Sequence, residues 1–91
     1  MKKFLLMYTM KGCPHCRDAK IKLNENNIKF LERDIHEYSE EYEMFVEVTN
    51  NEYIPAFRII DGPSKTSIYL APDRDFNSIE EGIKKIKDII L

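Results

Sequence analysis

Hydrophobic and polar positions along the chain predict seven elements of secondary structure. The first run, from Phe4 to Tyr8, is apolar throughout and ends before a turn that contains Gly12, which is typical of a buried central strand. Later segments alternate every second residue, as strands do, or repeat at the spacing of a helix. The predicted elements are strands over 4–8, 28–35, 53–60 and 67–70 and helices over 14–26, 40–48 and 78–90.

Each predicted helix has one apolar face that would pack on a sheet. The inward positions are Cys16, Ala19 and Leu23 in the first helix, Tyr42, Phe45, Val46 and Thr49 in the second, and Ile79, Ile83, Ile86 and Ile90 in the third. Ser39 is a candidate cap of the second helix, and either Asn77 with Glu80 or Ser78 with Glu81 forms a capping box for the third. The short connection after the first helix predicts two parallel strands, and the turn residues 61–64 predict an antiparallel hairpin.

The composition is that of an ordinary globular protein. Ninety-one residues suffice for one domain with a modest core and are too few for two, so we expect a single domain over 1–91. The start of the chain resembles the basic region of a secretory leader, but its apolar run is short and no small-residue cleavage site follows. No segment is long and apolar enough to cross a membrane. We therefore expect a cytoplasmic protein without membrane association.

The charge is divided along the chain. Residues 1–33 carry a net charge of +5, residues 34–62 carry −7, and residues 63–91 are balanced. A basic segment would attract anionic thiols or acidic partner surfaces, although ordinary solvated surface charge explains the pattern equally well. The basic residues are few and are not interleaved with aromatic side chains, so nucleic acid is not an expected partner.

Both cysteines of the chain lie in one motif, Cys13-Pro14-His15-Cys16, between the first strand and the first helix. Proline suits the first turn of a helix, so Cys13 falls at or beside the N-cap and Cys16 about one turn further in. Unpaired amides and the helix dipole then favour the thiolate form of Cys13. A thiolate attacks disulfides, and Cys16 is close enough to close a disulfide behind it. The motif predicts a redox-active dithiol.

Three other roles for the cysteines fit less well. A zinc site usually needs four ligands, and beyond the cysteines the chain offers only His15 and a distant His36, so we expect no metal. A cysteine protease needs a separate histidine and an orienting partner, for which His36 is thin support. A purely structural disulfide would remove little chain entropy, because the loop it closes is so short.

The motif and the order of elements resemble the glutaredoxin family, a branch of the thioredoxin fold, over essentially the whole chain. The most specific matches are Tyr8-Thr9, Cys13-Pro14-His15-Cys16 and Tyr53-Ile54-Pro55. The resemblance implies an α/β, thioredoxin-like fold, βαβαββα, with a mixed four-stranded sheet flanked by three helices. It also implies a cis peptide bond before Pro55, which would present the backbone of Ile54 beside Cys13 to a bound peptide-like thiol.

The resemblance further implies a glutathione site. Its predicted residues are Lys11, His15, Tyr53, Ile54, Pro55, Arg74 and Asp75. Asp75 would accept a hydrogen bond from the glutathione ammonium group, and Arg74 would reach a carboxylate. The chain departs from the family pattern at three places: Met10 stands where a lysine is common, His15 replaces the usual tyrosine, and Ala71-Pro72 replaces a pair of glycines. An imidazole at His15 would stabilise the Cys13 thiolate and raise the reduction potential.

These residues imply a glutathione-dependent thiol-disulfide oxidoreductase that reduces protein disulfides or glutathione mixed disulfides through Cys13 and Cys16. Its expected partners are glutathione and disulfide-containing proteins, and we expect a monomer. Two alternatives stay open. The altered lysine and glycine positions also fit a thioredoxin-like hydrogen donor, fed by a flavoprotein reductase and serving, for example, ribonucleotide reductase. A glutathione-dependent iron–sulfur carrier is less well supported, because Pro14 stiffens the motif.

Overall fold

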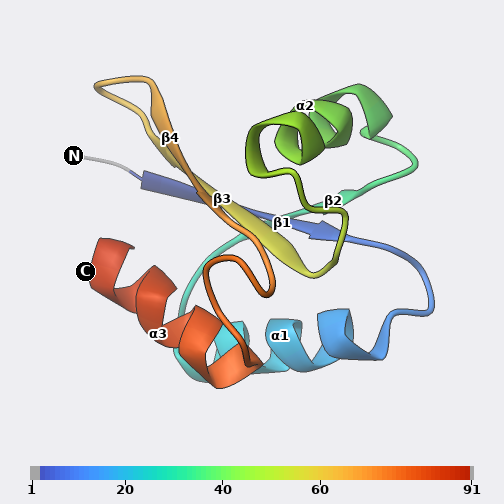
Figure 1. Cartoon of the computed structure of the whole chain (residues 1–91). Coiled ribbons are helices and arrows are strands. Elements are labelled where there is room, and N and C mark those ends of the chain that lie inside the picture. The colour runs from blue at the N-terminus through green and yellow to red at the C-terminus, as the bar shows by residue number, and fades with distance from the viewer. Residues whose placement is uncertain (1–2, 91) are drawn as a thin grey trace.

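The computed structural model describes residues 3–90, which form one mixed sheet with helices on both faces (Figure 1). The strands are β1 (Lys3–Thr9), β2 (Leu31–Asp34), β3 (Ala56–Asp61) and β4 (Thr66–Leu70), and the helices are α1 (Pro14–Glu25), α2 (Ser39–Thr49) and α3 (Ile79–Ile90). The sheet order is β2-β1-β3-β4, with β1 parallel to β2 and antiparallel to β3. The predicted fold class and element order are confirmed.

Strand β1 lies between β2 and β3 in the sheet, and helices cover both of its faces. Figure 1 shows α1 and α3 on one side of the sheet and α2 on the other. Leu5 and Met7 face the first side, whereas Tyr8 packs with Phe45 of α2 on the second. A strand buried on both faces reads as a continuous apolar run, which explains the pattern from Leu5 onward. Phe4, however, is 48% exposed, so the burial predicted for this run begins one residue later.

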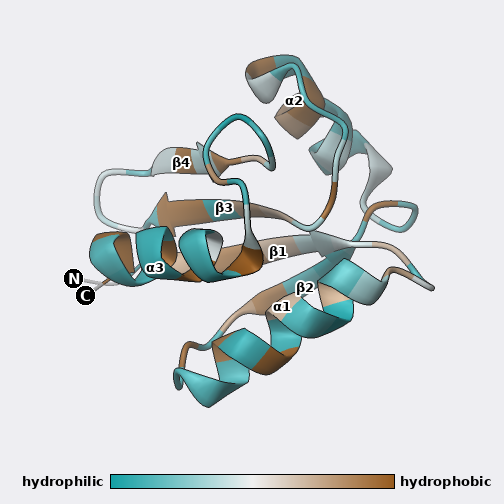
Figure 2. Cartoon of the chain, turned by 60° about the horizontal axis from the view of Figure 1, so that its bottom comes forward, coloured by the Kyte–Doolittle hydropathy of each residue, from teal (hydrophilic) through white to brown (hydrophobic). Residues whose placement is uncertain are grey.

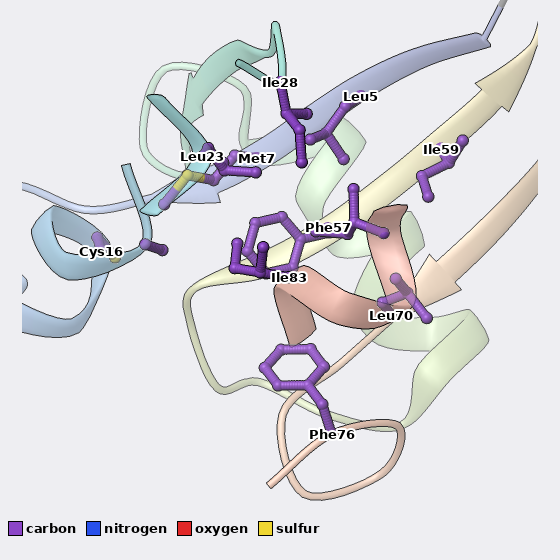
Figure 3. Close-up of a cluster of buried hydrophobic side chains, with 12 residues drawn as sticks. Leu5, Met7, Cys16, Leu23, Ile28, Phe57, Ile59, Leu70, Phe76 and Ile83 are labelled. Carbon is purple, nitrogen blue, oxygen red and sulfur yellow. The ribbon is translucent and has the colours of Figure 1, made fainter. Parts of the chain in front are cut away.

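The larger hydrophobic cluster lies between the sheet and helices α1 and α3. Figure 3 shows Phe57 of β3 near the middle of this cluster and Cys16 of α1 at one end. In Figure 2, α1 and α3 are mostly hydrophilic and are interrupted by hydrophobic residues, as expected for helices that bury one stripe on a sheet. Ile83 and Ile86 are buried in that stripe, which confirms the predicted apolar face of α3. The core therefore holds the second cysteine of the motif directly.

Strand β2 is shorter than the predicted 28–35. Its pairing with β1 starts at Leu31, opposite Leu6, and ends at Asp34. Ile28 is buried in the core but lies in the connection after α1, where its amide donates to the carbonyl of Leu23 at 2.9 Å. That bond closes the end of α1, so the Ile28 amide is not free to join the sheet.

Strand β3 also begins later than predicted, at Ala56 instead of Tyr53. The Ile54-Pro55 peptide bond is cis, as the resemblance implied. Proline has no amide N–H to give to a sheet, so regular pairing starts at the next residue. Tyr53 consequently lies outside the strand and is 63% exposed.

The observed helix caps agree in part with those predicted from the sequence. Ser78 Oγ accepts a hydrogen bond from the Glu81 amide at 3.1 Å, so the second of the two predicted capping arrangements starts α3. The prediction of Ser39 as the cap of α2 is wrong, because Ser39 is the first helical residue and Tyr38 occupies the N-cap. Asn50 ends α2 in the left-handed conformation, with φ of 53°.

Candidate active site

The cysteine motif sits at the start of α1 with the geometry that the sequence predicts. Gly12, with φ of +79°, turns the chain out of the segment after β1, a conformation that glycine adopts without strain. Cys13 is then the N-cap in extended conformation, and Pro14 occupies the first helical turn. The Cys16 amide donates to the Cys13 sulfur at 3.1 Å. An unpaired amide of the first helical turn therefore points at this sulfur, as an activated thiolate requires.

The two cysteines differ in exposure. They form a disulfide with Cα atoms 5.3 Å apart. Cys16 is 2% exposed and belongs to the hydrophobic cluster, whereas Cys13 is half-buried at the surface of that cluster. An incoming sulfur can therefore reach Cys13 from solvent, while Cys16 is available only from within the protein.

A groove of about 430 Å³ lies beside the motif on the side of the cis proline. His15, Tyr53, Ile54 and Pro55 line this groove together, and Asp73 lies on the opposite wall. We call it the proline groove. Four residues of the predicted glutathione site thus share one cavity, although they come from two segments far apart in the sequence.

The other predicted glutathione residues lie elsewhere. Lys11 lines a second groove, which shares no lining residue with the first. Asp75 Oδ2 accepts from the Ala71 amide at 2.8 Å and from the Arg74 guanidinium at 3.0 Å. The Asp75 carboxylate therefore stabilises its own loop. The binding roles of Lys11, Arg74 and Asp75 stay predictions.

Asp73 is the carboxylate that the sequence comparison with the family missed. It adopts a left-handed conformation, with φ of 67°, and its amide donates to the carbonyl of Phe76 at 2.8 Å. This tight loop turns Asp73 toward the proline groove. The signal in the sequence is only that an aspartate tolerates positive φ better than most residues.

The second groove has a volume of about 440 Å³, and it is this groove that Cys13 and Cys16 line, whereas His15 is the residue of the motif that lines the proline groove. Its walls carry charges of both signs, including Glu32 of β2. Glu32 Oε2 accepts from Lys20 Nζ at 3.0 Å and from Thr9 Oγ1 at 2.8 Å. These two hydrogen bonds, that of Lys20 above all, hold the pKa of Glu32 below its ordinary value. We call this second groove the charged groove.

Two properties of the described chain bear on other functions. Among residues 3–90, His, Cys, Asp and Glu side chains form no group of three or more that is placed to hold a metal ion. Within the same residues, each helix is too short or too polar to span a membrane.

Solved structures with the same fold are thioredoxin-like. Crystal structures of the thioredoxin-like protein BC3987 and of a mutant of it match with TM-scores of 0.59 and 0.60, at 18% and 16% identity. They cover 93% and 96% of this chain and 97% and 99% of their own. The solution structure of oxidised thioredoxin from Plasmodium falciparum matches with a TM-score of 0.62 at 16% identity, covering 98% of this chain and 82% of its own. No curated relative matches the chain.

The fold and the cysteine pair define a thioredoxin-like thiol redox protein with a vicinal dithiol. The model of the glutaredoxin family matches residues 5–62, a segment that holds most of β1, the motif, α1, β2, α2 and β3. The chain belongs to the glutaredoxin family, which implies thiol-disulfide oxidoreductase chemistry, and the Cys13–Cys16 pair fits a CxxC dithiol motif.

Proposed function

We propose that this protein reduces glutathione mixed disulfides and protein disulfides with electrons from glutathione. The observation that supports the proposal best is the position of Cys13, at the N-cap of α1 and at the surface, with the buried Cys16 bonded behind it. Such a cycle needs a compartment rich in reduced glutathione, so we also propose that the protein works in the cytoplasm.

On a glutathione mixed disulfide, the Cys13 thiolate attacks the glutathione sulfur. The S–S bond of the substrate breaks, the substrate leaves as a thiolate that takes up a proton, and a bond between Cys13 and glutathione forms. A second glutathione thiolate then attacks the glutathionyl sulfur. Glutathione disulfide leaves, and the Cys13 thiolate is restored without any use of Cys16.

On a protein disulfide, Cys13 attacks one sulfur and releases the other as a thiolate. Cys16 then attacks Cys13, which frees the second substrate thiolate and closes the bond between Cys13 and Cys16. Two glutathione molecules return this disulfide to the dithiol and leave as glutathione disulfide. Disulfide-containing proteins are therefore the second class of proposed substrate.

The proline groove is the proposed seat of glutathione. Backbone groups of Ile54 would pair with its cysteinyl residue, while His15 and Tyr53 would form the flanking walls. Asp73 supplies a carboxylate in the same groove that would accept from the ammonium group. We place this ion pair at Asp73 because Asp75 already accepts two hydrogen bonds from its own loop.

A thioredoxin-like hydrogen donor is the second candidate, with ribonucleotide reductase among its possible substrates. It is favoured by the same two observations that depart from the family site: Lys11 lies in the charged groove, and Asp75 and Arg74 bond to each other. Both would weaken the capture of glutathione charges, while the dithiol chemistry of Cys13 and Cys16 would be unchanged.

The experiment compares two electron sources for one disulfide substrate at equal concentrations of protein. Glutathione with glutathione reductase should sustain NADPH oxidation, whereas thioredoxin reductase should give a rate close to background. If thioredoxin reductase sustains turnover and glutathione does not, the thioredoxin-like candidate replaces our proposal.

A further inference from the structure

Two loops that are far apart in the sequence line the proline groove, together with His15 and residues 76–79. One wall is Tyr53-Ile54-Pro55 and the other contains Pro72 and Asp73. A single side chain joins them: Asn51 Nδ2 donates to the Pro72 carbonyl at 2.6 Å, and Asn51 Oδ1 accepts from the Tyr53 amide at 2.9 Å. Both ends of the Asn51 amide are therefore in use, one on each wall.

The end of α2 holds Asn51 in place. Thr49 is buried, and its hydroxyl donates to the Phe45 carbonyl at 2.8 Å. Tyr42, also on α2, donates from its hydroxyl to the Glu52 carbonyl at 2.8 Å. The residues on both sides of Asn51 are thus tied to the helix, so the bond to Pro72 connects a fixed segment to the opposite wall. A planar amide with a donor and an acceptor on the same carbon suits this task.

We propose that Asn51 is a positioning residue that sets the width of the proline groove and, through it, the affinity for disulfide substrates. The inference rests on the proposed function, because it takes this groove as the substrate site. Asn51 acts through the two walls and stands apart from Cys13 and Cys16. Its loss should therefore raise KM and leave the sulfur chemistry, and with it kcat, nearly unchanged.

The test is Asn51→Asp, assayed with a glutathionylated peptide and glutathione. The carboxylate still accepts from the Tyr53 amide but places a second acceptor against the Pro72 carbonyl, so the connection to that wall is lost. We expect KM for the peptide to rise about five- to tenfold, the effect of losing roughly one hydrogen bond, with kcat within about twofold. The control is Asn50→Asp, which adds the same charge at the exposed neighbouring residue and should keep the wild-type KM.

A KM for Asn51→Asp equal to that of Asn50→Asp, or a fall in kcat alone, overturns the proposal. Amide hydrogen exchange separates this result from a failure of the proposed function. The Asp73 and Asp75 amides bond within the second wall, to Phe76 and Ala71, and should exchange several-fold faster in Asn51→Asp. If wild-type protein does not turn over the peptide, the proposed function fails. If exchange at these two amides is the same in Asn51→Asp as in wild type, Asn51 does not connect the two walls.

Discussion

Solvent reaches the two sulfurs of the active site to very different extents. Cys13 is half-buried at the N-cap of α1, and Cys16 is 2% exposed within the hydrophobic cluster. In reduced protein, limited iodoacetamide at neutral pH should therefore modify Cys13 at least about tenfold faster than Cys16. Peptide mapping by mass spectrometry measures the two rates, and faster labelling of Cys16 would reverse the assignment of nucleophile and resolving cysteine.

Two neighbouring carboxylates are expected to contribute differently to glutathione binding. Asp73 lines the proline groove, whereas Asp75 accepts from the Ala71 amide and from Arg74. Asp73→Asn should raise KM for glutathione several-fold, because the amide oxygen still accepts a hydrogen bond while the ion pair with the ammonium group is lost. Asp75→Asn is the matched control: it keeps an oxygen for the Ala71 amide and should leave KM within about twofold. The opposite pattern would place the ammonium of glutathione at Asp75.

Single residues also show where prediction from sequence stops. The motif revealed Cys13 and Cys16 because proline and the cysteine spacing determine their positions on a helix. Asp73 and Asn51 carried no such signal. Their roles depend on hydrogen bonds between segments that the fold brings together, such as that from Asn51 to the Pro72 carbonyl. The neighbouring Asn50 ends α2, and the sequence does not distinguish the role of Asn51 from that of Asn50.

At the scale of elements, periodicity predicted the order of strands and helices, while their limits followed tertiary contacts. The stripe of isoleucines was sufficient to place α3. The starts of β2 and β3 were predicted too early, because the Ile28 amide bonds to the end of α1 and Pro55 has no amide to contribute. The hydrophobic pattern indicates which residues are buried and does not by itself indicate which residues pair in a sheet. Ile28 and Pro55 are both buried, although neither lies in a strand.

One of the polar contacts between α2 and the sheet can be tested directly. The Tyr8 hydroxyl on β1 donates to Glu41 Oε2 at 2.6 Å. Tyr8→Phe leaves that carboxylate without this donor at the interface and should lower the free energy of unfolding by about 1–3 kcal/mol. Tyr38→Phe is the control, because it removes the same chemical group, a tyrosine hydroxyl, from another site. It keeps the aromatic ring, whose centroid lies 4.4 Å from the Arg33 guanidinium carbon. Urea unfolding at neutral pH compares the two, and equal losses would contradict the role of Tyr8.

The hydrogen bond between Tyr8 and Glu41 also predicts how the stability of the protein depends on pH. Burial, and then the hydrogen bond to Glu41, raises the pKa of Tyr8 above its ordinary value. Because the pKa of Tyr8 is higher in the folded than in the unfolded state, its contribution to stability is fully present at pH values below the unfolded-state pKa. This contribution is lost as the pH rises above that value. Wild-type protein should therefore lose stability above about pH 10 more steeply than Tyr8→Phe. Parallel curves for the two proteins would show that Tyr8 titrates normally.

At the scale of the whole molecule, the active site lies where elements from both faces of the sheet meet. Helix α1 and the large cluster hold the cysteines, and the loop after α2 supplies the cis-proline wall of the groove. The basic charge of residues 1–33 includes Lys11, Arg17 and Lys20, which the fold gathers in the charged groove beside acidic side chains of residues 32–37. The charge division seen in the sequence therefore becomes a groove of mixed sign.

We expect that Cys13 alone can remove glutathione from a substrate, while Cys16 serves only protein disulfides. The most direct test is the turnover of a glutathionylated peptide by Cys16→Ser and Cys13→Ser, with glutathione and glutathione reductase as the electron source. We predict that Cys16→Ser keeps a substantial part of the wild-type rate, about a tenth or more, and that Cys13→Ser falls to background. Equal loss in the two variants, or activity that survives in Cys13→Ser, would contradict the account.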